Sequence, residues 1–237
     1  MWYNGRMNAK NFREGLSAGI PIGLGYFAVS FAFGMMASSG GLTIGQAVLI
    51  SLTNVTSAGQ FAGLDIMFAG GAYLEMALTQ LIINLRYSLM SFSLSQKIDD
   101  SGHPLHRFLV AFGVTDEIFG VSAAREGRLS PWFNYGAMAV AIPGWALGTL
   151  MGAISGNLLP DRIMSALSVA IYGMFLAIII PPAKKSAQVL AVVVCAMLIS
   201  TGFAYLPVLK TVSSGMVIIL TTVLVAGTAA KLAPIES

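Results

Sequence analysis

Five ionisable side chains interrupt the long apolar runs of this sequence: Asp65, Glu75, Arg86, Asp116 and Glu117. If these runs cross a membrane, each charge costs about 2.5–3.5 kcal/mol at the bilayer centre, so it must face protein or water. Acids at that depth are natural proton carriers, and an arginine there can hold a carboxylate. The alternative is a structural ion pair that only fixes helix packing.

The five charges differ in depth. Arg86, Asp116 and Glu117 lie near the middles of their runs, whereas Asp65 and Glu75 flank a glycine turn and are interpreted as structural charges. Glu75 precedes Arg86 by 11 residues, about 16 Å along a helix, which is too far for a direct pair. Arg86 therefore needs Asp116 or Glu117 as its partner.

A polar stretch lies at the centre of the apolar run 43–69, which is long for one span: Asn54-Val55-Thr56-Ser57-Ala58-Gly59-Gln60-Phe61. One interpretation is a discontinuous helix, whose free N–H groups would form an anion site at mid-membrane. The other is a kinked helix, in which Thr56 and Ser57 bond back to the preceding turn. Pro21, with Gly25 and Tyr26, lies at a similar depth in the first run, where proline frees a backbone carbonyl.

The composition excludes most soluble functions. Of 237 residues, 56% are hydrophobic and 10% are charged, against about 25% charged in soluble domains. We therefore expect an all-α polytopic membrane bundle that forms a single integral domain over residues 1–237, with 1–14 as an interfacial, cytoplasmic lead-in. Eight apolar runs are read: roughly 15–37, 43–69, 72–94, 107–124, 132–155, 161–182, 187–206 and 213–230.

The distribution of lysine and arginine indicates an orientation. With a cytoplasmic N-terminus and eight crossings, eight basic residues lie inside: Arg6, Lys10, Arg13, Arg125, Arg128, Lys184, Lys185 and Lys231. Four lie outside: Lys97, Arg107, Arg162 and Lys210. If 107–124 does not cross, the count becomes five inside and seven outside. Eight crossings with both termini cytoplasmic are favoured, and a seven-span arrangement with a re-entrant 107–124 is the alternative.

A weak internal repeat is visible. Ile20-Pro21 recurs 122 residues later as Ile142-Pro143, and both halves carry glycines at four-residue spacing. These ladders are Gly15, Gly19, Gly23 and Gly148, Gly152, Gly156. Such ladders let helix backbones approach closely in lipid, so we predict that the second lies in a helix–helix contact.

Several motifs resemble the AzlC family, the large permease subunit of bacterial branched-chain amino acid exporters. They are residues 19–26 (GIPIGLGY), 32–34 (AFG), 57–61 (SAGQF), 84–90 (NLRYSLM) and 116–119 (DEIF). The resemblance implies a bacterial cytoplasmic (inner) membrane protein that exports leucine, isoleucine, valine and related apolar amino acids such as methionine. It also implies a small AzlD-like membrane subunit of about four helices as the partner.

A zwitterionic substrate needs a cation or helix N-terminus, an acid, and an apolar pocket. Substrate-binding candidates are Pro21, Gly25, Tyr26, Ser57, Gly59, Gln60, Phe61, Asn84, Arg86 and Phe119; proton-coupling candidates are Asp116 and Glu117. We expect a secondary transporter coupled to the proton gradient, with a passive channel or a structural membrane subunit as alternatives. The sequence carries no Walker lysine loop and no nucleophile–base arrangement, so no enzyme, cofactor or metal site is expected.

Overall fold

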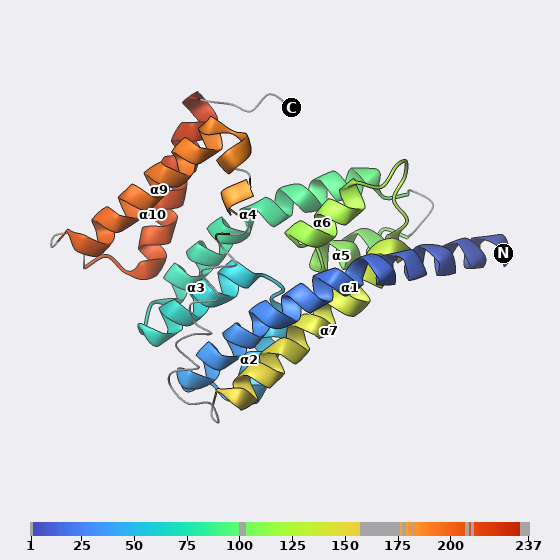
Figure 1. The fold of residues 1–237 in the computed structure, drawn as a ribbon, viewed down its shortest axis with the longest axis horizontal. Coiled ribbons are helices and arrows are strands. Elements are labelled where there is room, and N and C mark those ends of the chain that lie inside the picture. Colours follow the sequence, from blue (N-terminus) through green and yellow to red (C-terminus); the bar gives the residue numbers. More distant parts are fainter. Residues whose placement is uncertain are drawn as a thin grey trace. The chain divides into compact units, whose positions relative to one another are not determined.

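The chain is seen in a computed structural model that describes residues 2–99, 103–156, 176, 179–181, 183–206, 209 and 211–232. These residues form α1 (Trp2–Ser39), α2 (Ile44–Thr53), α3 (Ser57–Phe68), α4 (Tyr73–Lys97), α5 (Leu105–Phe112), α6 (Asp116–Ala123), α7 (Pro131–Ser155), α9 (Ala187–Tyr205) and α10 (Ser214–Leu232), as Figure 1 shows. The all-α class is confirmed. Most of the expected run 161–182 lies outside the described residues.

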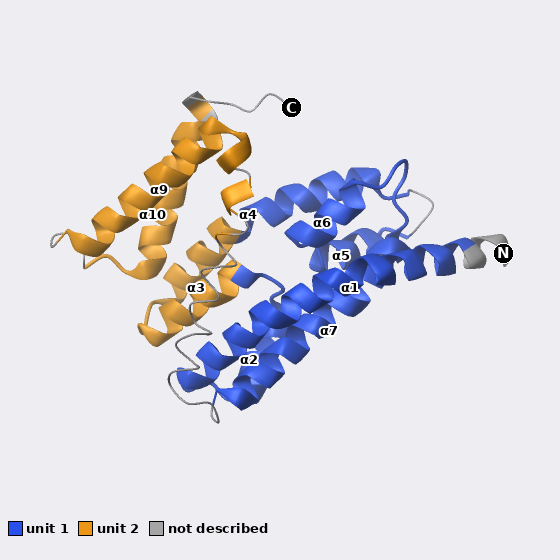
Figure 2. Ribbon diagram, in the orientation of Figure 1, with its two compact units in different colours: residues 1–57, 84–164 blue, residues 58–83, 165–237 orange. Residues whose placement is uncertain are grey.

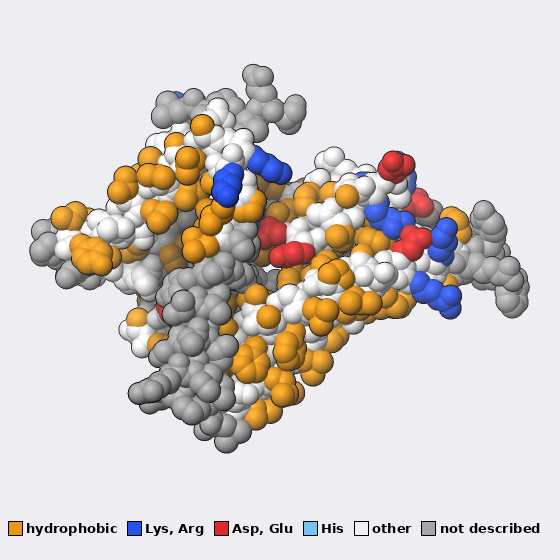
Figure 3. All heavy atoms as spheres, in the orientation of Figure 1, with side chains coloured by type: hydrophobic (Ala, Val, Ile, Leu, Met, Phe, Trp, Pro, Cys, Tyr) orange, Lys and Arg blue, Asp and Glu red, His pale blue; other side chains and the backbone are white. Residues whose placement is uncertain are grey.

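The helices group into two compact units (Figure 2). Unit 1 comprises Met1–Ser57 and Asn84–Met164, and unit 2 comprises Ala58–Ile83 and Ser165–Ser237. Three of the described helices are long and apolar enough to cross a membrane: Met7–Ser39, Pro131–Ser155 and Ala187–Tyr205. On the face in Figure 3, hydrophobic side chains cover much of α7 and α9, and many of unit 1's charged side chains gather near the start of α1. The expected single domain stays a prediction.

Unit 1 is built on α1 and α7, which lie side by side (Figure 1). A Cβ added at Gly144 would lie 2.6 Å from the Gly23 carbonyl oxygen, and one at Gly152 would overlap the Phe31 carbonyl. The members of each pair are 121 residues apart, so the two helices run parallel and in register. The predicted contact of the second glycine ladder is confirmed, and its 121-residue offset is one less than the 122 residues between Ile20-Pro21 and Ile142-Pro143.

The expected discontinuous helix is confirmed in the run 43–69. Helix α2 begins with a capping box, in which the Gln46 amide N–H donates to Thr43 Oγ1 (3.3 Å) and the Thr43 N–H donates to Gln46 Oε1 (2.9 Å). It ends at Thr53, and residues 54–56 are not helical before α3 begins. Thr53 Oγ1 donates to the Leu49 carbonyl at 2.8 Å, a bond that competes with continuation of the helix.

The run 107–124 is also broken, into α5 and α6. Each has eight residues and is about 12 Å long, less than half of the hydrocarbon core. Near the start of α5, His106 Nδ1 lies 2.7 Å from Tyr135 Oη of α7, and Gly113 at its end contacts Met138. The contacts of α5 thus move from Tyr135 to Met138, so α5 runs away from the start of α7.

Helix α6 returns along the same stretch of α7. Ile118, near its start, shares a cluster with Ala137 and Ala141, whereas Ser122, near its end, accepts a hydrogen bond from Asn134 Nδ2 at 3.0 Å. The hairpin thus enters and leaves unit 1 at the end where α7 begins. This geometry favours the re-entrant alternative for 107–124, and the number of membrane crossings stays a prediction.

The hairpin places two basic residues at the end of unit 1 opposite to the one that eight crossings predict. Lys97 and Arg107, expected outside, belong to the end of unit 1 where α1 and α7 begin. Arg125 Nη2 lies 2.8 Å from Glu14 Oε2 of α1, and Arg128 Nη1 donates to the Ile98 carbonyl at 3.4 Å. The basic residues gathered at this end are Lys10, Arg13, Lys97, Arg107, Arg125 and Arg128.

Cysteine labelling tests the hairpin. In a Cys195→Ser background, we expect His103→Cys and Glu126→Cys to react with an impermeant maleimide from the same membrane side. The reason is that the start of α5 and the end of α6 lie at the same end of unit 1. Labelling is compared in intact cells and inverted vesicles. Reaction from opposite sides would mean that residues 105–123 cross the membrane.

A larger side chain at Gly152 tests the α1–α7 contact. Gly152→Leu must separate the two backbones, so we expect a loss of stability of about 1–3 kcal/mol and a lower membrane abundance. Gly227→Leu on α10 is the control, since no heavy atom lies within 4 Å of an added Cβ there. Equal abundance of the two variants would contradict the close contact.

Candidate functional site

Two acids occupy the first turn of α6. Thr115 caps this helix, and its Oγ1 accepts a hydrogen bond from the Ile118 N–H at 3.3 Å. Asp116 and Glu117 follow directly as the first helical residues. A helix N-terminus carries partial positive charge, which stabilises nearby carboxylates by about 0.3–1 kcal/mol each. The re-entrant half-helix therefore presents two carboxylates at its inner end.

Arg86 of α4 pairs with one of these acids. Its Nη1 lies 2.9 Å from Asp116 Oδ2, and the side chains are 44% and 35% exposed. Depth left Asp116 and Glu117 as alternatives for the partner of Arg86, and the structure pairs it with Asp116. Arg86 Nη2 also donates to Tyr87 Oη at 3.2 Å. The guanidinium thus holds a carboxylate and a phenol but retains an accessible surface.

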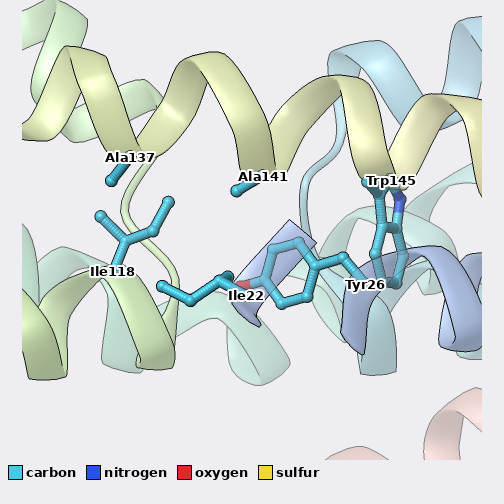
Figure 4. Close-up of a cluster of buried hydrophobic side chains, with 6 residues drawn as sticks. All are labelled: Ile22, Tyr26, Ile118, Ala137, Ala141 and Trp145. Carbon is cyan, nitrogen blue, oxygen red and sulfur yellow. The ribbon is translucent and has the colours of Figure 1, made fainter. Parts of the chain in front are cut away.

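Glu117 has a separate partner on α1. Tyr26 Oη donates to Glu117 Oε2 at 2.5 Å. The Tyr26 ring is buried and meets the Trp145 ring edge to face, with centroids 5.4 Å apart (Figure 4). Ile22 and Ile118 belong to the same apolar cluster. Packing therefore fixes the phenol, and adjacent acids on α6 have different partners because consecutive side chains diverge by about 100°.

The break between α2 and α3 reaches the same layer of unit 1. Thr56 Oγ1 donates to Asn84 Oδ1 at 2.6 Å, two residues before Arg86 on α4. Val55 packs against the cluster that contains Tyr26. The non-helical residues before α3 and the first turn of α6 therefore contact neighbouring parts of one framework.

The other predicted site residues are not joined to this group by the contacts described. Pro21 and Gly25 are exposed on α1. Ser57 begins α3, and the Gly59 carbonyl in unit 2 accepts a hydrogen bond from Gln80 Nε2 at 2.7 Å. Gln60 and Phe61 are buried in the same unit, and Phe119 packs against a second cluster around Leu94 and Phe133. Their roles in binding stay predictions.

Sequence reasoning missed three contributors to this region: Thr56, Tyr87 and Lys97. Tyr87 follows Arg86 directly, and a hydroxyl beside a membrane arginine is a usable signal. Thr56 belongs to the polar stretch, but the sequence suggests for its hydroxyl only a bond back to the preceding turn, not the contact with Asn84. Lys97 lies far from the acids in sequence, and only the hairpin brings its ammonium to the end of α6.

Glu75 is confirmed as a structural charge. Its Oε1 accepts a hydrogen bond from the Gly215 N–H at 3.1 Å, in the first turn of α10 within unit 2. A carboxylate at this position satisfies an N–H group that the helix leaves free and interacts favourably with the helix dipole. The structural role proposed for Asp65, which is exposed on α3, stays a prediction.

The geometry suits a small solute with both charges. Two carboxylates at the start of α6 meet a guanidinium from α4 and a phenol from α1. Such charges must face protein or water, because facing lipid would be unfavourable. Arg86 can hold a carboxylate, and the acids can hold an ammonium or a proton. Among the described residues, no three His, Cys, Asp or Glu side chains form a group suited to a metal ion.

The charged group lies within the part of the chain that a protein-family model matches. The family model described as AzlC protein matches residues 21–159. An uncharacterized membrane protein of Archaeoglobus fulgidus is 33% identical over 178 residues, 73% of this chain and 76% of that protein. Inner membrane protein YgaZ of Escherichia coli (strain K12) is 31% identical over 150 residues, 62% of this chain and 61% of that protein. No solved structure matches.

Membrane abundance tests the ion pair. Arg86→Gln strands Asp116, so we expect lower abundance; breaking a fully buried pair costs about 3–5 kcal/mol, and this half-exposed pair less. Adding Asp116→Asn should restore abundance because no charge is left unpaired. Arg86→Gln with Glu117→Gln is the control and should not recover, since Glu117 bonds Tyr26. Equal recovery in both doubles would reject the specific pairing.

Proposed function

The chain belongs to the AzlC family, and from this premise we propose that it is a secondary transporter for apolar amino acids. The proposed direction is export of leucine, isoleucine, valine and methionine across the bacterial cytoplasmic membrane. The coupling ion is the proton, and the protein acts as the large subunit beside a small AzlD-like membrane protein. The match over residues 21–159 supports the class, because it contains the charged group described above.

The Arg86–Asp116 pair beside Glu117–Tyr26 is the observation that carries this proposal. An amino acid carries one carboxylate and one ammonium group, so its headgroup is complementary to an arginine beside acids. Without substrate, Asp116 neutralises Arg86 at 2.9 Å. The substrate carboxylate would take the place of Asp116 on the guanidinium, and the released acid would pair with the ammonium.

Proton coupling follows from the same exchange. A carboxylate that loses its cation in a poorly solvated site favours its protonated form. Glu117 accepts a hydrogen bond from the Tyr26 phenol, whereas Asp116 pairs with a cation. We therefore assign the coupled proton to Asp116 and Glu117, and the apolar side chain of the substrate to the aromatic residues Tyr26 and Phe119 of unit 1.

The basic end of unit 1 supports an orientation. Cytoplasmic ends of membrane proteins carry an excess of lysine and arginine. Six basic residues of unit 1, Lys10, Arg13, Lys97, Arg107, Arg125 and Arg128, lie at the end where α1 and α7 begin, so this end is assigned to the cytoplasm. The N-terminus is then cytoplasmic, and the re-entrant hairpin inserts from the cytoplasmic side.

Exposed apolar helices support a membrane partner. Helix α9 has no buried residue, and Leu190, Met197 and Leu198 are at least half exposed. Such a face packs against lipid or against helices of another chain. The AzlD-like subunit is the proposed occupant of part of this apolar surface.

Leucine flux in proteoliposomes tests the transport proposal, with the full chain reconstituted alone and with a co-expressed small subunit. We expect saturable flux that an imposed pH gradient stimulates. Asp116→Asn and Glu117→Gln should lower coupled flux about tenfold or more, because each removes a charge-assisted contact of about 1.5–3 kcal/mol. Glu126→Gln, an exposed loop acid, is the matched control and should leave flux unchanged.

Two outcomes would contradict it. Flux that rises without saturation and ignores the pH gradient would indicate a passive channel. A chain whose Arg86→Gln/Asp116→Asn variant transports as well as the parent uses these charges only for assembly.

A further inference from the structure

We propose that Lys97 is a positioning residue that holds α6 at the level where Asp116 meets Arg86. Lys97 is the last residue of α4. Its Nζ donates to the Ala123 carbonyl at 2.6 Å and also to the Arg125 carbonyl. Ala123 is the last residue of α6, so the ammonium caps the end of the half-helix whose other end carries the acids. The effect of this residue on transport rests on the proposed function.

The contact has a clear electrostatic basis. The last carbonyls of a helix have no partner within the helix, and they carry partial negative charge. A lysine ammonium satisfies two carbonyls at this end and opposes that charge. Helix α6 therefore has negative side chains at its positive pole and a cation at its negative pole.

Two long cationic side chains tie α6 to α4, one at each end. Arg86 and Lys97 are 11 residues apart, about 16 Å along α4. Asp116 and Arg125 are nine residues apart, about 13 Å along the line of α6. These similar lengths show that α6 lies along the second half of α4 in the same chain direction, with one polar contact near each end.

Apolar packing between these contacts does not set the level of α6. Met90 of α4 and Phe119 of α6 pack against one apolar cluster that includes Leu94. Hydrophobic contact is not directional, so a small slide of α6 would preserve much of it. The polar contacts of α6, to Arg86 and Lys97 of α4 and to Asn134 of α7, are directional and would be lost on sliding.

The backbone hydrogen bonds at the end of α4 do not hold α6, which is the role assigned to the Lys97 ammonium. The Leu129 N–H donates to the Lys97 carbonyl at 2.8 Å, and the Asp99 N–H donates to the Leu129 carbonyl at 3.0 Å. Leu129 lies six residues beyond α6, after a turn at Gly127 with φ +69°. These bonds fix the exit loop, whereas the Lys97 side chain reaches the end of α6 itself.

A double-mutant cycle tests the coupling without any substrate. Lys97→Met and Asp116→Asn are compared singly and together by apparent thermal midpoint in detergent. We expect Lys97→Met to lower the midpoint by about 2–4 °C. Asp116→Asn should then lower it further by clearly less than it does in the parent chain, because the pair is already weakened. Lys97→Arg should keep the parent midpoint, and Lys10→Met, which removes an exposed charge from the same end, is the control.

Leucine efflux supplies the second measurement. Lys97→Met should lower coupled efflux about two- to tenfold, mainly by raising the half-saturating concentration, and Lys97→Arg should restore it. Additive midpoint losses, or a Lys97→Met variant that behaves like Lys10→Met, would overturn the proposal. If the cycle is non-additive but the parent chain moves no amino acid, the proposed function fails and the positioning role stands.

Discussion

Close backbone contact between α1 and α7 is the constraint on which the rest of unit 1 depends. Helices in lipid gain little from burying apolar side chains against each other, so close packing of small residues must hold them together. Gly23 and Gly144 bring the two backbones together near the middle of both helices. This contact sets Tyr26 beside Trp145 and creates the surface on which α6 packs.

A short helix that begins inside the bundle solves the problem of placing acids there. Asp116 and Glu117 sit where helix N–H groups are free, and each has a partner from a different neighbouring helix. Arg86 and Tyr26 thereby become parts of one site although they lie 60 residues apart. Exposure of the ion pair leaves it open to exchange with a charged solute, which a fully buried structural pair would not allow.

Both broken segments contribute to this arrangement. The break before α3 supplies Thr56 to Asn84, and the break before α6 supplies the acids to Arg86 and Tyr26. Non-helical backbone at membrane depth is tolerated only where protein or a water-filled cavity surrounds it. The breaks therefore mark the interior of the bundle and coincide with its polar groups, which is the pattern of secondary transporters.

The amino-acid order alone determined the helical class, most helix ends, the glycine contact and the restriction of the Arg86 partner to Asp116 or Glu117. These features depend on local hydropathy, turn residues and the cost of an unpaired charge at a known depth. Tertiary structure decided that 107–124 is a hairpin, because the sequence shows one continuous run there and only the contacts of α5 and α6 with α7 show the reversal. It also decided that Asp116 rather than Glu117 pairs with Arg86, and that Lys97 reaches α6, since these choices depend on side-chain direction and on contacts between distant segments.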